Sequence, residues 1–193
     1  MPRPLRRSLP ITGAAVVMTA ALALADTPAG VAPHVRPEST EARELLDELT
    51  THSPTARALV DEVNRSTVVV YVRHRMFTST AFSGRLALLS SGSDTRYVIV
   101  ELACGQSRVD ALVTLGHELQ HAVEVARAPA VVSAPTLAAH YARIGLRTSG
   151  PTEPLTFETQ AALDVSSSVR REVLGSTART THDRARSHRH EDP

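Results

Sequence analysis

The chain has 193 residues, a formal net charge of +1 and 42% hydrophobic residues, enough apolar material for one domain with a real core. Its single cysteine, Cys104, excludes an internal disulfide, and all 21 basic residues are arginine. Three of these arginines lie within residues 1–25, so the rest of the chain carries a net charge of −2 and gives no indication of a nucleic-acid partner.

Residues 1–25 have the pattern of a secretory signal peptide. Three arginines precede an apolar run over residues 11–25, and Ala23-Leu24-Ala25 fits a small-x-small cleavage site. The run is short for a membrane span, although an uncleaved anchor is the alternative. Residues 26–37 are rich in Pro, Ala and Val and predict a flexible linker. The expected location is secreted or periplasmic, with no stable membrane span after cleavage.

Two helices and a small sheet are predicted next. Apolar residues recur at helical spacing over residues 40–50, and again after Ser53-Pro54, where the serine suits an N-cap and the proline the first helical position. A β-branched run at residues 67–72 is typical of a buried strand. Residues 85–90 and 95–103 predict the two strands of a hairpin.

An unpaired edge of this sheet, which has about three strands, is expected to hold an extended peptide through main-chain hydrogen bonds. Periodicity does not tell which strand between Arg85 and Ala103 forms the edge, and the alternative is that residues 73–84 cover it. Cys104 follows the second hairpin strand and is expected to be buried there.

The most specific motif is HELQH at residues 117–121. Ser107 is suited to the N-cap of a helix, with Asp110 three residues later, so the motif falls in mid-helix. His117 and His121 then lie one turn apart and can converge on one zinc ion at about 2.0–2.1 Å. Glu118 projects beside the metal, where it can take a proton from a zinc-bound water.

A catalytic zinc usually has three protein ligands, and Glu158 is the best candidate for the third. A helix is predicted from Thr156, as N-cap, to about Leu174, with Gly175 ending it. A buried carboxylate at the head of this apolar stripe needs a partner such as a metal ion. The alternative is an ordinary first-turn glutamate that the helix dipole favours.

Other polar residues could contribute to such a site. Weaker candidates for the third ligand are Glu153, in a loop before a proline, Asp164, on another helix face, and His140. Glu124 and Asp110 are candidates for hydrogen bonds to the two histidines.

One more helix is predicted between the motif and Glu158, with Leu137, Tyr141 and Ile144 on one face and Gly145 at its end. The Tyr141 hydroxyl could donate to an oxyanion, although a tyrosine at this spacing is more often a packing residue.

The motif at residues 117–121, followed after 36 intervening residues by Glu158, resembles the gluzincin-type zinc metallopeptidases. The resemblance covers about 60 residues, from Ser107 to about Leu174. It implies an α+β, zincin-like fold that is mostly helical, with a small sheet before the motif helix. Many members have an aspartate four residues after the ligand glutamate, and this chain has Ala162 there.

The resemblance also implies a function. Zn²⁺ would be bound by His117, His121 and Glu158, with Glu118 as general base, in an exported bacterial metallohydrolase whose leading substrate is a peptide or protein. One alternative is a non-catalytic, zinc-stabilised binding domain, and another is a metal-free helical interaction domain.

The expected metallohydrolase domain covers residues 38–175. The arginine- and histidine-rich residues 176–193 are predicted to be a disordered tail, with metal or anionic-surface binding as the alternative. The sequence does not indicate the oligomeric state.

Overall fold

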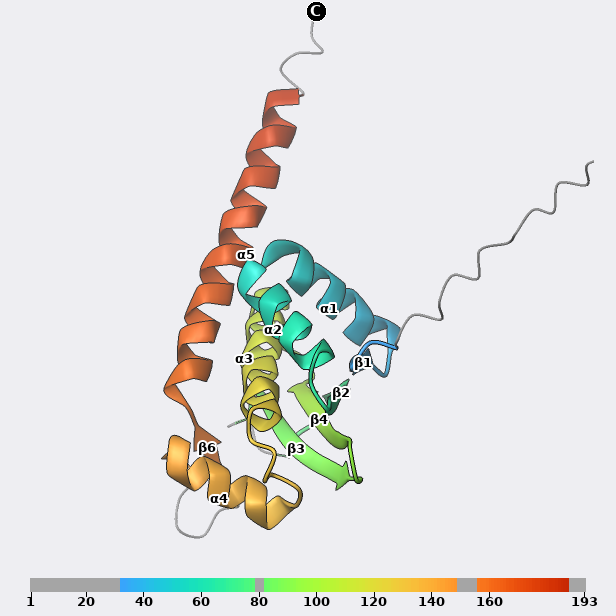
Figure 1. Cartoon of the computed structure of the whole chain (residues 1–193). Helices are drawn as coiled ribbons and strands as arrows, with labels where there is room; N and C mark the ends of the chain where they lie inside the picture. The colour runs from blue at the N-terminus through green and yellow to red at the C-terminus, as the bar shows by residue number, and fades with distance from the viewer. Residues whose placement is uncertain (1–31, 79–81, 149–155, 188–193) are drawn as a thin grey trace, which may run out of the picture. The chain divides into compact units, whose positions relative to one another are not determined.

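The computed structural model describes residues 32–78, 82–148 and 156–187, with side chains as far as Ser176. The predicted signal peptide and the first half of the predicted linker, residues 26–31, lie outside these ranges. The described residues form a mixed α and β domain with five helices and a small sheet (Figure 1). None of the described helices is long and apolar enough to cross a membrane.

The main sheet has four strands, in the order β1 (Val35–Pro37), β2 (Val68–Arg75), β4 (Arg96–Ala103) and β3 (Gly84–Ser91). The first three are parallel and β3 is antiparallel to β4. The three predicted strands are present as β2, β3 and β4, and the sheet has one strand more, β1, which lies within the predicted linker. The strand β1 was missed because three residues are too few to show a period, and its pairing partner β2 is distant in sequence.

Strand β3 forms one edge of this sheet. Within the described residues no strand pairs with its outer side. The hairpin of β3 and β4 is confirmed, and the predicted edge strand is therefore β3.

Helices α1 (Thr40–His52), α2 (Pro54–Asn64) and α3 (Arg108–Ala126) pack on one face of the sheet. Each begins at a serine whose hydroxyl accepts a backbone N–H of the first turn, as predicted for Ser53 and Ser107. Side chains alternate between the two faces of a strand, so every second residue of the central strands β2 and β4 faces these helices and belongs to the core. The members of this set are Val68, Val70, Val72, Val98, Val100 and Leu102.

The second half of the domain contains α4 (Ala134–Ile144), the short strands β5 (Leu146–Arg147) and β6 (Phe157–Glu158), and α5 (Gln160–Ser187). Glu158 pairs with Leu146 in an antiparallel ladder, so it precedes the last helix instead of opening it. The predicted N-cap Thr156 was therefore wrong. The Thr159 hydroxyl accepts the N–H of Ala162 and takes that place.

Helix α5 also continues past Gly175 to Ser187, so the predicted helix end was wrong and the last turns of the helix lie in the predicted tail. A glycine in a helix interior costs about 1 kcal/mol, which packing can offset. Val169 and Val173 on the preceding turns are buried in the core and supply that packing.

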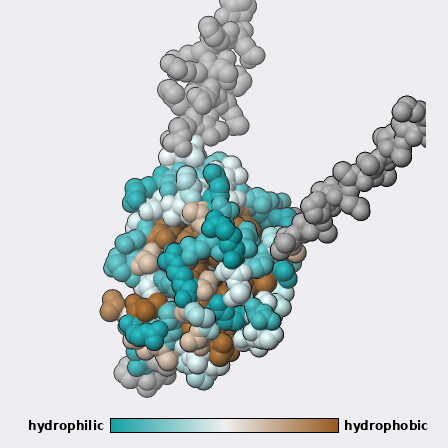
Figure 2. Space-filling model, in the orientation of Figure 1, coloured by the Kyte–Doolittle hydropathy of each residue, from teal (hydrophilic) through white to brown (hydrophobic). Residues whose placement is uncertain are grey.

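Helices α3 and α5 lie side by side (Figure 1). A Cβ on Gly116 would come within 2.9 Å of the Val169 side chain, so the glycine permits this close approach. Outside the core, hydrophilic residues cover most of the visible face, with hydrophobic patches between them (Figure 2). Cys104 is exposed, contrary to expectation, because β4 ends at Ala103 and the chain turns there toward α3.

Candidate metal centre

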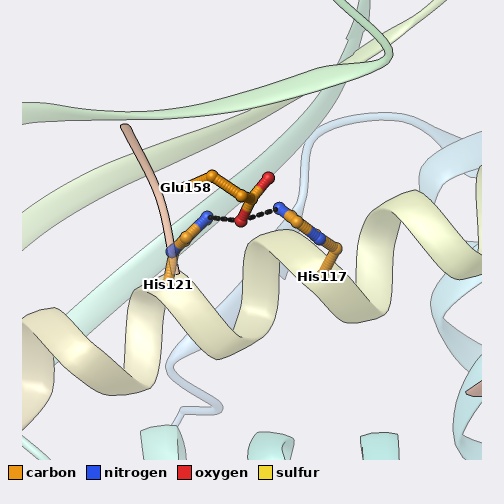
Figure 3. Close-up of side chains that lie close together, drawn as sticks. All are labelled: His117, His121 and Glu158. Carbon is orange, nitrogen blue, oxygen red and sulfur yellow. Dashed lines mark ion pairs between the residues drawn. The ribbon is translucent and has the colours of Figure 1, made fainter. Parts of the chain in front are cut away.

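Three side chains from two distant segments meet at one point beside α3 (Figure 3). The Nε2 atoms of His117 and His121 lie 3.2 and 3.6 Å from Oε1 of Glu158. A tetrahedral metal site with ligand distances of about 2.0–2.1 Å has edges of about 3.4 Å, close to both values. The donor atoms all lie within 4.8 Å of one another, so the group could hold a metal ion.

The outer nitrogen of His117 is held by Ser166. The two atoms, Nδ1 and Oγ, are 2.9 Å apart, and the serine hydroxyl donates its own hydrogen to the Ala162 carbonyl at 3.0 Å. The serine oxygen therefore accepts from Nδ1–H of His117. In the neutral ring this tautomer places the lone pair on Nε2, the nitrogen that a metal ion would bind, whereas a protonated ring donates from Nε2 to Glu158.

The outer nitrogen of His121 faces a carboxylate. Its Nδ1 lies 2.8 Å from Oε2 of Glu124, which confirms the predicted role of Glu124. Glu124 also accepts from the Thr159 hydroxyl at 2.7 Å, and the Thr159 N–H donates to Glu158 at 2.9 Å. Thr159 thus connects Glu124, the partner of His121, to Glu158, the candidate third ligand, and it also caps α5.

The corresponding prediction for Asp110 was wrong. Its carboxylate accepts from Arg170 at 2.8 Å and from the Ser107 hydroxyl at 2.6 Å. Asp110 lies in the exposed first turn of α3, where an acidic residue satisfies the helix end instead of a histidine further along.

The electrostatic field at this point favours positive charge. Burial alone would disfavour a charged His121, but the carboxylates of Glu124 and Glu158 outweigh it and raise the pKa of His121 to about 9. Burial likewise opposes ionisation of Glu158, but hydrogen bonds from His117 and His121 lower its pKa to about 2. A divalent cation would be stabilised by the same carboxylates.

Glu118 lies beside the group without joining it. Its side chain is 5% exposed, and Oε2 has no hydrogen-bond partner in the part of the chain that the structure describes. Burial raises the pKa of Glu118 to about 7, with the two histidines opposing the rise. Strand β3 passes close to Glu118 at Gly84. A Cβ added to Gly84 would lie 2.8 Å from Oε1 of Glu118.

Tyr141 supports the site by packing. Its hydroxyl donates to the backbone carbonyl of His121 at 3.1 Å, and its ring meets the His121 ring edge-on at 5.3 Å. It also stacks on Phe157, the residue before Glu158, at 6.5 Å. The hydroxyl proton is thus engaged by the main chain, and the packing alternative describes this residue better than the oxyanion one.

A cavity of about 1000 Å³ opens onto the group. Residues of β3, α3, α4 and β6 line it, and so do Arg75, the last residue of β2, and Phe77, which follows β2. The three ligand candidates and Glu118 share this cavity. The cavity therefore connects the edge strand β3 to the candidate metal ligands.

The other third-ligand candidates lie elsewhere or outside the description. Asp164 is exposed and accepts from Gln160, His140 contacts Arg143, and Glu153 falls within residues 149–155, which the structure does not describe. Ser166 and Thr159 were missed. Ser166 was open to prediction, because it lies on the helix stripe of Ala162 and Val169 that faces α3.

Comparisons with known proteins add little to this geometry. No family model matches the chain, and no solved structure matches it. The chain is similar to the methionine import ATP-binding protein MetN of Bordetella avium (strain 197N), with 35% identity over 111 residues. This match covers 56% of the chain and only 28% of that protein. It therefore leaves the family of the chain open.

Proposed function

We propose that this chain is a zinc-dependent metallohydrolase, and specifically an exported peptidase with a zincin-like domain. One observation carries the proposal. Two imidazole Nε2 atoms and a carboxylate oxygen converge, and the buried carboxylate of Glu118 lies beside them with an oxygen that has no hydrogen-bond partner among the described residues. Two imidazoles and one carboxylate form a donor set that suits zinc and leaves a coordination position for substrate.

The residues of the chain divide the chemistry between them. When bound, zinc supplies Lewis acidity, which polarises a carbonyl and lowers the pKa of water toward 7. Glu118 accepts the proton of the attacking water and passes it to the leaving amine. Burial of Glu118 raises its pKa and so favours its taking up that proton.

The edge strand supports a peptide substrate. The outer side of β3 is unpaired among the described residues, and β3 lies over Glu118 at Gly84. A peptide that extends the sheet there would hold its carbonyl groups near the metal-binding group through main-chain hydrogen bonds.

ATP binding, which the name of the similar Bordetella protein carries, is not part of the proposal. A phosphate-binding loop of the G-x-x-x-x-G-K-[ST] type needs a lysine for the phosphates. These 193 residues contain no lysine, so such a loop does not lie within them.

Metal content and hydrolysis test the proposal together. Purified protein should contain one zinc per chain and cleave a mixed peptide library. Glu158→Ala should lose zinc because it removes one of three ligands. Asp164→Ala is the matched control, since it removes an exposed carboxylate from the following helix, and it should keep both properties.

Wild-type protein that neither binds zinc nor loses activity with a chelator would refute the metal site. Zinc at full stoichiometry without hydrolysis of any peptide would instead favour the non-catalytic binding domain.

A further inference from the structure

A second charged cluster lies on the opposite face of the sheet, at the same edge. Glu101 of β4 is 1% exposed and accepts hydrogen bonds from three arginines. Arg73 and Arg75 come from β2 and Arg85 from β3. Burial opposes ionisation of Glu101, but these hydrogen bonds lower its pKa to about 2. The carboxylate therefore holds three guanidinium groups in fixed positions.

The charges of this cluster do not balance. Three guanidinium groups share the one carboxylate of Glu101, which leaves an excess of two positive charges. Glu38 lies 3.9 Å from Arg73, but this exposed pair interacts weakly and does not reach the other two arginines. In the described part of the chain, Glu101 is the one carboxylate that pairs with Arg75 and Arg85, so their charge is only partly compensated.

Arg75 and Arg85 face the cavity of the metal centre. Both guanidinium groups lie over the ring of Phe77, at 6.0 and 5.6 Å from its centroid. These three residues line the same cavity as the metal-binding group, whereas Arg73 is not among the described residues that line it. The excess charge therefore faces the space where a substrate would lie.

The alternation of β3 connects the two faces. Gly84 pairs with the core residue Leu102 and faces Glu118, whereas Arg85 pairs with Glu101 and points to the other side. A peptide that extends the sheet at β3 alternates in the same way. If one peptide residue lies opposite Gly84, the peptide residue that follows it along β3 lies opposite Arg85, and its side chain is on the same face as the Arg85 side chain.

We propose that the cleft selects peptides with an acidic side chain next to the residue that lies opposite Gly84, and that Arg75 and Arg85 bind this carboxylate. The inference rests on the proposed peptidase function and names its substrate class. Guanidinium groups bind carboxylates through charge-assisted, often bidentate hydrogen bonds, and preorientation by Glu101 and Phe77 reduces the cost of ordering them. The competing explanation is that the cluster only covers the outer face of the sheet.

Peptide retention separates these explanations. The Glu118→Gln protein, loaded with zinc and immobilised, is exposed to two hexapeptide libraries that differ only in Glu or Gln at one fixed position. Retained peptides are quantified by mass spectrometry. Glu peptides should be retained about tenfold more strongly, and the preference should fall with added salt.

A second substitution in the same protein locates the preference. Arg85→Gln should reduce the retention ratio to about one. Arg73→Gln is the matched control, because Arg73 binds the same carboxylate and is equally exposed, at 43% against 45%, but lies off the cavity. It should keep the preference. Arg75→Gln provides a second cavity-facing variant should Arg85→Gln fail to fold, as judged by circular dichroism.

Equal retention of both libraries, or an equal loss in the Arg73 and Arg85 variants, would overturn the inference. Hydrolysis by the wild-type protein is scored separately. Cleavage without acidic preference would support the peptidase proposal and refute the proposed acidic specificity. Retention of Glu peptides without any cleavage would support the acidic specificity and refute the peptidase proposal.

Discussion

Glu101 and Glu118 are two buried carboxylates on opposite sides of the same sheet edge, and their surroundings differ completely. Glu101 accepts hydrogen bonds from three arginines, which hold its pKa at about 2. Glu118 receives no hydrogen bond at Oε2 from the described residues, and burial raises its pKa to about 7. The first carboxylate stays charged over the whole physiological range, whereas the second can take up and release a proton near neutral pH.

The difference separates a carboxylate that stabilises the fold from one that costs stability. A buried polar atom without a partner costs about 1–3 kcal/mol, and native proteins keep few of them. Groups of this kind are often found at functional sites, which is the physical reason that the proposed function gives Glu118, and not Glu101, the role of proton acceptor.

The largest effect is expected for Glu118→Gln. Peptide hydrolysis should fall by about 10³-fold, because the amide cannot accept the proton of the attacking water. Zinc content should be unchanged, and the free energy of unfolding should stay the same or rise, since an unsatisfied carboxylate is removed. Elemental analysis, kinetics and urea denaturation measure the three quantities. A fully active variant would eliminate Glu118 as the general base.

Glu101→Gln should do the opposite and destabilise the protein. The expected loss at neutral pH is about 2 kcal/mol, below the 3–5 kcal/mol of a fully buried pair because the three arginines are partly exposed. Since folding lowers the pKa of Glu101, its contribution is present above about pH 4.5 and is lost as the pH falls toward 2.

Urea denaturation at several pH values measures this contribution. The stability of the wild-type protein should fall toward that of Glu101→Gln between about pH 4.5 and pH 2, and zinc content at neutral pH should not change. Parallel pH profiles of the two proteins would show that Glu101 does not supply the difference.

A smaller effect is expected at Gly84, where β3 crosses Glu118. A Cβ there would lie 2.6 Å from Thr114 Cγ2 and 2.8 Å from Glu118 Oε1, so Gly84→Ala should displace the carboxylate and lower kcat about tenfold without loss of zinc. Gly92→Ala is the matched control in the same hairpin, because its new Cβ would make only an ordinary contact at 3.6 Å. Equal rates for both variants would argue against close packing at Gly84.

The sequence predicted the parts of the molecule that depend on local signals. Capping serines and helical spacing located α3, and the i,i+4 spacing placed His117 and His121 on one face. Glu158 was selected as the head of an apolar stripe in a helix predicted to begin at Thr156. The helix begins later, at Gln160, but Glu158 does converge with the histidines. Zinc itself, and the catalysis proposed for it, stay predictions.

The features that the sequence did not predict depend on pairing between distant segments. Strand β1 has too few residues to show a period, and β6 is defined by its partner β5. The same is true of the Glu101 cluster, because its arginines come from two other strands and only the sheet register brings them together. Thr159 is the N-cap of α5 because β6 occupies the first residues of the predicted helix, so that the N-cap lies three residues later than the predicted Thr156.

Glu158, the candidate third ligand, is separated from His121 by 36 intervening residues, which include α4. An ion held by all three residues would therefore act as a reversible cross-link that closes this loop. In the chain-entropy treatment of cross-links, a loop of this length is worth about 4 kcal/mol. Helix α4, which lies between α3 and α5, would then be better protected from proteases while the ion is bound. Loss of the ion would make α4 easier to cleave, and such cleavage is irreversible.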